Sequence, residues 1–74
     1  MAVEIELFGQ LARDHEPRQT LALASPMQVQ EVILLLSLEI DQIGLISING
    51  VQSELHDSVP MDCRLCFFPP MSGG

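Results

Sequence analysis

One stretch of the chain has the periodicity of a core-facing helix, and it lies between segments that alternate between apolar and polar residues. Its apolar residues recur at the spacing of a single helical face, at Val29, Val32, Ile33, Leu36 and Ile40. Ser25-Pro26-Met27-Gln28 is typical of a helix start, because serine caps, proline suits the first helical position and Gln28 completes a capping-box spacing. The helix is expected to end within 39–42, with Gly44 just beyond it.

Alternation with a period of two predicts the strands. In the opening segment Val3, Ile5 and Leu7 share one face, and two glutamates lie on the other. Residues 20–23, 45–48 and 63–68 are predicted as further strands. Asn49-Gly50 predicts a tight hairpin turn into a short return arm at 51–55, because both residues tolerate positive φ. The segments 13–18 and 56–62 are predicted to be polar loops.

This order of elements predicts an α+β fold in which one main helix covers one face of a mixed sheet of four to five strands. The first two strands are expected to pair antiparallel, because their connection is short. The first and last strands are expected to be central and parallel, which is a small β-grasp arrangement. Residues 1–68 are expected to form this domain, and residues 69–74 a flexible C-terminal tail ending in Gly-Gly.

Size and charge exclude several classes of protein. Seventy-four residues, 47% of them hydrophobic, suffice for one compact core but argue against an enzyme with its own cofactor cleft. Ten acidic residues against three arginines and no lysine give a net charge of −7. Such a chain repels nucleic-acid phosphates and anionic membranes, so a basic protein surface is the expected partner. The N-terminus resembles no secretory signal, and the longest apolar run is Val32–Leu36, so a cytoplasmic location is expected.

The two cysteines form a Cys63-Arg64-Leu65-Cys66 motif. A redox motif would favour a helix N-terminus, but this segment is predicted to be a strand. Residues three apart on a strand point to opposite faces, so the two sulfurs are not expected to meet. Zinc would need four ligands, and His15 and His56 lie at no recognisable ligand spacing and are expected to be solvated. No metal site is therefore predicted.

The segment Phe67-Phe68-Pro69-Pro70-Met71-Ser72-Gly73-Gly74 is the most informative part of the chain. On composition alone, the Gly-Gly is also compatible with an incidental flexible end. Pro69-Pro70 favours a functional arm, because two prolines stiffen the exit and cannot continue a sheet ladder. Such an arm presents a carboxylate without a side chain to a narrow channel of another enzyme. If Phe67 faces the core, Phe68 faces outward and is a candidate docking anchor.

This ending resembles that of the MoaD/ThiS sulfur-carrier family, relatives of ubiquitin, and most of all the small subunit of molybdopterin synthase, MoaD. Three other features are similar to that family: the segment Phe8–Arg13, the helix pattern, and the Ile48-Asn49-Gly50-Val51 hairpin. The Phe-Phe-Pro-Pro-x-x-Gly-Gly ending is the specific element, and the other similarities are common in small α+β domains. The resemblance implies a ubiquitin-like β-grasp fold.

The resemblance also implies a non-catalytic subunit whose chemistry is carried by Gly74. An ATP-dependent adenylyltransferase of the MoeB/ThiF type would adenylylate Gly74, and a sulfurtransferase would supply the sulfur of a thiocarboxylate. The tail residues Gly73, Ser72, Met71, Pro70 and Pro69 would then enter the active site of the large synthase subunit, of the MoaE type. No cofactor would be bound by the chain itself.

Other functions remain open from the sequence. The same ending suits a ubiquitin-like modifier, in which Gly74 would form an isopeptide bond with a target lysine. A sulfur carrier for thiamine thiazole synthesis is a further alternative, although the Phe-Phe-Pro-Pro segment resembles the molybdopterin branch. The last alternative is a plain interaction domain with an incidental glycine end.

Overall fold

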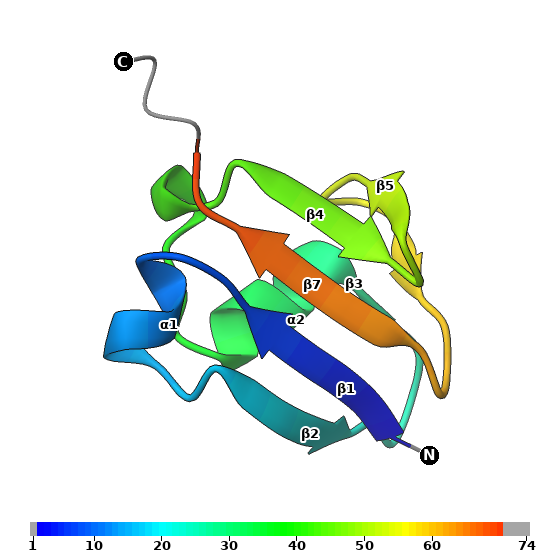
Figure 1. Cartoon of the computed structure of the whole chain (residues 1–74). Coiled ribbons are helices and arrows are strands. Elements are labelled where there is room, and N and C mark those ends of the chain that lie inside the picture. The colour runs from blue at the N-terminus through cyan, green and yellow to red at the C-terminus, as the bar shows by residue number, and fades with distance from the viewer. Residues whose placement is uncertain (1, 71–74) are drawn as a thin grey trace.

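The computed structural model describes residues 2–70 of the chain (Figure 1). The elements follow in the order β1 (Ala2–Leu7), α1 (Leu11–Asp14), β2 (Arg18–Ala22), β3 (Met27–Gln28), α2 (Val29–Leu35), the 3₁₀ helix η1 (Ile40–Gln42), β4 (Leu45–Ile48), β5 (Val51–Ser53), β6 (Ser58–Val59) and β7 (Arg64–Phe68). The described residues thus combine short strands with one main helix, as the periodicity predicts.

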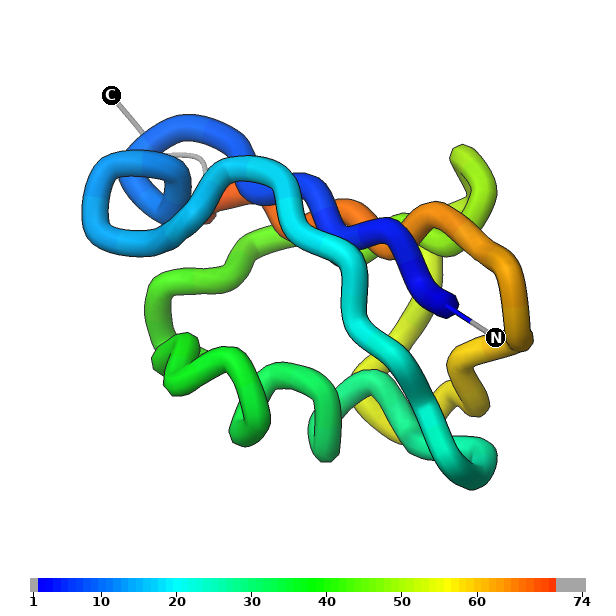
Figure 2. Tube along the Cα trace, turned by 90° about the horizontal axis from the view of Figure 1, so that it is seen from below, coloured from blue at the N-terminus to red at the C-terminus, as the bar shows by residue number. Residues whose placement is uncertain are grey.

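Five of the strands form a mixed sheet in the order β2-β1-β7-β4-β5. β1 and β7 are parallel neighbours at its centre, and β1 pairs antiparallel with β2, so both predictions of strand pairing are confirmed. β4 pairs antiparallel with β7 and β5. Seen along its edge, the sheet forms one layer and α2, in green, lies in a second layer across one face (Figure 2).

The core lies between these two layers. Val3, Ile5 and Leu7 of β1 face α2, and Leu65 and Phe67 of β7 lie beside them; all five are buried. From the helix, the buried side chains are those of Val29, Val32 and Ile33. Because each buried aliphatic or aromatic side chain contributes about 1.5–3 kcal/mol, this two-layer core supplies most of the folding free energy.

The helix begins later than the sequence predicts. Its N-cap is Gln28, not Ser25, and the Gln28 N–H donates to the Glu31 carboxylate (3.3 Å) within a capping box. The preceding residues form β3, which pairs antiparallel with β6 in a second, two-stranded sheet. The prediction of a continuous loop at 56–62 is therefore wrong. Val59 of β6 is buried, and packing rather than local pattern explains this short pairing.

The helix also ends earlier than predicted. Ser37 adopts a positive φ of 59°, its N–H donates to the Leu34 carbonyl, and the Leu38 N–H donates to the Ile33 carbonyl. This is a Schellman motif, which ends α2 and redirects the chain. As a result Leu38 is buried at 6% exposure, whereas Ile40, predicted to belong to the buried stripe, is 47% exposed in η1.

Other boundaries differ by one or two residues, and one helix was not expected. The short helix α1 follows β1, buries Leu11 and extends into the predicted connection at 13–18. The hairpin turn is confirmed, with φ of 51° at Asn49 and 83° at Gly50. Asn49 has a second role: its backbone N–H donates to the Arg64 carbonyl and its side-chain oxygen accepts from the Arg64 N–H, both at 2.9 Å. No helix among residues 2–70 has the length and apolar character to cross a membrane.

Candidate functional site at the end of the last strand

The predicted tail is described only as far as Pro70. Met71, Ser72, Gly73 and Gly74 lie outside the described residues, so their predicted roles stay predictions. The described part of the site comprises Phe68 at the end of β7 and the two prolines that follow it. We call Pro69 and Pro70 the tail root. In Figure 1 the tail root leaves the sheet beside η1 and β4.

The two phenylalanines point to opposite faces of the sheet, as predicted. Phe67 is fully buried against the core. Phe68 is half-buried on the outer face, where its ring stacks on that of Phe8 with centroids 4.5 Å apart and an interplanar angle of 8°. Leu45 lies directly opposite Phe68 in β4 and is 39% exposed. We call Phe8, Phe68 and Leu45 the apolar patch.

Phe8 is the site residue that the sequence alone did not reveal. The parallel register pairs Leu7 with Phe67, which brings the next residue of each strand together. Phe8 also belongs to a segment that resembles the sulfur-carrier family, which was the one signal pointing to it. An offset or stacked aromatic pair contributes about 0.5–1.5 kcal/mol beyond the area that it buries. The stack therefore holds Phe68 in a defined position next to the tail root.

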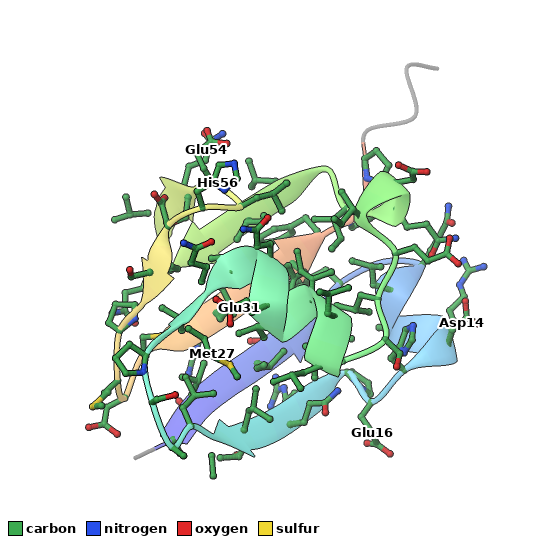
Figure 3. All side chains as sticks on the ribbon, turned by 180° about the vertical axis from the view of Figure 1, so that it is seen from behind. Asp14, Glu16, Met27, Glu31, Glu54 and His56 are labelled. Carbon is green, nitrogen blue, oxygen red and sulfur yellow. The ribbon has the colours of Figure 1, made fainter. Side chains whose placement is uncertain are left out.

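The rest of the outer face is polar and balanced in charge. Glu4 lies opposite Arg64, and Glu6 lies opposite Arg18, with 3.6 Å between the Glu6 carboxylate and the Arg18 guanidinium. The acidic excess lies elsewhere. Residues 19–63 contain no lysine or arginine, and their six acidic side chains, all exposed, are Glu31, Glu39, Asp41, Glu54, Asp57 and Asp62. Figure 3 shows Glu31 on α2 and Glu54 near the rim of the helix side.

Two glycines flank the tail root. The Gly44 N–H donates to the Phe68 carbonyl (2.7 Å), and on the other side of β7 the Phe8 N–H donates to the Phe67 carbonyl (3.1 Å). A Cβ at Gly44 would lie 2.4 Å from Pro70 Cα, and a Cβ at Gly9 would lie 2.6 Å from Pro69 Cγ. Gly44 therefore lies beside the end of β7. The sequence predicts it just beyond the end of the main helix, which is wrong.

The two cysteines do not form a site together. Cys63 is part of the core, whereas Cys66 is 8% exposed and lies opposite Glu6 and Ser47 in the register. Both thiols are free, and burial raises the pKa of Cys63 above its ordinary value. Among residues 2–70 no three His, Cys, Asp or Glu side chains are grouped to hold a metal ion. His56 is exposed, as expected, whereas His15 is half-buried.

The strand order, the crossing helix and the central parallel pair define a β-grasp fold. Over their full lengths, this chain and the crystal structure of SAMP1 from Haloferax volcanii are similar, with a TM-score of 0.77 and 21% sequence identity. No family model matches the sequence, and no curated protein matches it either. At this identity the similarity shows the fold, and the function has to be argued from the site.

Proposed function

We propose that this chain is a sulfur carrier whose C-terminal glycine, Gly74, is adenylylated and converted to a thiocarboxylate that donates sulfur for molybdopterin biosynthesis. The observation that supports this proposal is a β-grasp domain whose central last strand leads directly into Pro69-Pro70-Met71-Ser72-Gly73-Gly74. The chain contributes the acyl group and its presentation, and the partners contribute the catalytic groups.

The chemistry requires activation, because a carboxylate is a poor electrophile. A carboxylate oxygen of Gly74 attacks the α-phosphorus of ATP on a MoeB/ThiF-type adenylyltransferase, and pyrophosphate leaves. The terminal sulfur of a persulfide, supplied by a sulfurtransferase, attacks the acyl carbon, and AMP leaves. A thiol then cleaves the sulfur–sulfur bond, which releases the thiocarboxylate and leaves a disulfide. ATP is used by the partner, and this chain binds no cofactor of its own.

The thiocarboxylate is then the nucleophile for the synthase reaction. The tail residues from Pro69 to Gly74 enter the active site of a MoaE-type large subunit, where the sulfur attacks a carbon of the pterin precursor and displaces a leaving group from it. Water then hydrolyses the bond between the sulfur and the acyl carbon, which leaves the sulfur on the pterin and regenerates the Gly74 carboxylate. The apolar patch beside the tail root provides the docking anchor for the adenylyltransferase and for the large subunit, with Phe68 at its centre. Docking raises the effective concentration of the sulfur at the acceptor.

Intact-mass spectrometry tests this proposal. The purified chain is first weighed to establish that Gly74 is its C-terminal residue. It is then incubated with an adenylyltransferase of the MoeB/ThiF type, ATP and a sulfurtransferase charged with sulfur. We expect a species in which one sulfur replaces one oxygen, lost on hydrolysis or alkylation, and no such species in a variant that lacks Gly74. Conjugates to lysines of other proteins, lost in the same variant, would instead identify a protein modifier.

A further inference from the structure

Within residues 2–70, no backbone hydrogen bond to Pro69 or Pro70 directs the tail root. Gly44 donates the last ladder hydrogen bond, to the Phe68 carbonyl, and neither Pro69 nor Pro70 has an N–H to donate. Beyond Phe68, packing must therefore determine the direction of the chain. The atoms next to the tail root belong to Gly9, in the turn after β1, and to Gly44, immediately before β4.

Gly44 is crowded against backbone atoms. A Cβ at this position would lie 2.4 Å from Pro70 Cα, 2.7 Å from Pro70 N and 2.8 Å from the Pro69 carbonyl oxygen. Separations below 3.0 Å are essentially never found for Cβ atoms, so with a methyl group here the tail root and position 44 must move apart. No side-chain rotation relieves such a contact. Gly44 has no positive φ, so its backbone conformation is open to alanine and only space requires glycine.

Gly9 is crowded in a different way. A Cβ at this position would lie 2.6 Å from Pro69 Cγ and 3.2 Å from Pro69 Cδ, but at an ordinary 3.7 Å from Pro69 Cβ. The contact is thus with the ring of the proline and not with the backbone. Gly9 also has a positive φ of 59°, so alanine would be strained there in addition.

We propose that Gly9 and Gly44 form an exit notch that sets the direction in which the tail leaves the sheet, and that Gly44 is thereby a positioning residue for the reaction at Gly74. The inference rests on the proposed function. Adenylyl transfer to Gly74 requires the reacting atoms in near-attack geometry, and a misplacement of about 1 Å can lower rates by about a hundredfold. A displaced tail root moves the starting point of everything that must enter the partner's channel.

The main test compares Gly44→Ala with Gly50→Ala. Gly50 has a positive φ of 83°, and a Cβ added there would have no atom within 4 Å, so its replacement strains the hairpin without contacting the tail root. We measure ATP–pyrophosphate exchange with the adenylyltransferase, and urea unfolding for both variants. For Gly44→Ala we expect kcat to fall by about tenfold or more while KM changes by less than about twofold, because the docking patch is intact. Gly50→Ala is expected to lower the unfolding midpoint and leave kcat unchanged.

A double-mutant cycle distinguishes the contribution of Gly9 to the notch from that of Gly44. Pro69→Ala removes the ring atoms that a Cβ at position 9 would contact, so it should restore part of the activity lost in Gly9→Ala. It should restore nothing in Gly44→Ala, where the contact is with backbone. Unchanged kcat in Gly44→Ala, or the same kcat in Gly44→Ala and Gly50→Ala, would overturn the inference, and so would the absence of any coupling between positions 9 and 69.

A readout independent of activity distinguishes failure of this inference from failure of the proposed function. Proton NOEs between Gly44 and Pro70 in the full chain report the notch directly, and we expect them in the wild type and a changed pattern of intensities between the same positions in Gly44→Ala. If these NOEs behave so but no variant is adenylylated, the proposed function is wrong. If the wild type is adenylylated and the NOEs are absent, the notch is wrong.

Discussion

The two faces of β7 carry different kinds of residue. Leu65 and Phe67 point toward α2 and are fully buried, whereas Arg64 and Phe68 lie on the outer face and remain accessible. The buried face holds the two layers together, and the outer face offers an apolar patch within a charge-balanced polar surface. The difference teaches that one strand can supply both buried side chains that stabilise the domain and an accessible apolar patch, because alternate side chains are independent of each other.

The largest effect is expected on the buried face. Phe67→Ala removes a fully buried ring and should lower the free energy of unfolding by about 3–5 kcal/mol. Phe68→Ala removes only the half-buried ring stacked on Phe8 and should lower it by about 1 kcal/mol. Urea unfolding followed by circular dichroism measures both. Equal losses at the two neighbouring positions would contradict the assignment of separate roles to the two faces.

Partner binding should depend on the outer face more than on the buried face, which is the reverse of the order expected for stability. Phe68→Ala is expected to raise the KM for the adenylyltransferase by about tenfold, because it removes the centre of the apolar patch. Phe8→Ala should have a similar, smaller effect through loss of the stack. Thr20→Ala, on the same face in β2 but away from the patch, is the matched control and should leave KM unchanged. If Thr20→Ala raises KM as much, the patch is not the anchor.

The two faces of the sheet can also be compared through the chemical reactivity of the cysteine on each side. Cys66 on the outer side should be alkylated by iodoacetamide before Cys63, which lies in the core with a raised pKa. Single-serine variants, Cys63→Ser and Cys66→Ser, assign the two rates by mass spectrometry. Faster reaction at Cys63 under native conditions would show that the core face opens more readily than the outer face.

Alkaline pH should lower the stability of the fold through Cys63 on the buried face. Because burial raises the folded-state pKa of Cys63, the neutral thiol stabilises the fold fully below the unfolded pKa of roughly 8.5. That stability is lost as the pH rises through the higher folded value. The urea midpoint should therefore fall as the pH rises above roughly 8.5, and it should fall less in Cys63→Ala than in the wild type. A urea midpoint that falls equally with pH in both proteins would exclude Cys63 as the origin of the pH dependence.

The smallest effect is expected from the ion pair on the outer face. Arg18 is 84% exposed, and its guanidinium lies 3.6 Å from the Glu6 carboxylate. Such exposed pairs contribute from about 0 to 1 kcal/mol, so Arg18→Gln should change the free energy of unfolding by less than about 0.5 kcal/mol. Urea unfolding at low and high salt checks this. A larger, salt-dependent loss would mean that charge on the outer face also supports the fold.

Local patterns predicted the parts of the molecule that depend on neighbours in sequence. The alternation of Val3, Ile5 and Leu7 indicated the buried face of β1, and the Asn49-Gly50 pair predicted the hairpin, since each is a property of a few adjacent residues. The placement of Phe67 inside and Phe68 outside followed from the same alternation.

The parallel pairing of β1 with β7 was predicted although it joins distant residues, but other parts that depend on distant residues were not. The pairing of β3 with β6 involves two residues on each side and has no periodic signal. The early end of α2 at Ser37, a residue that is not glycine, buries Leu38 and exposes Ile40, against the helical spacing. Here packing against the sheet outweighs helical periodicity.

The sequence by itself determined that this is a small, acidic α+β domain with one covering helix and with a Phe-Phe-Pro-Pro segment after its last strand. Only the tertiary structure decided that Phe8 stacks on Phe68, and that Gly9 and Gly44 flank Pro69 and Pro70. The physical reason is that alternation specifies the face on which a side chain lies, whereas the order and register of strands determine which distant residues share that face.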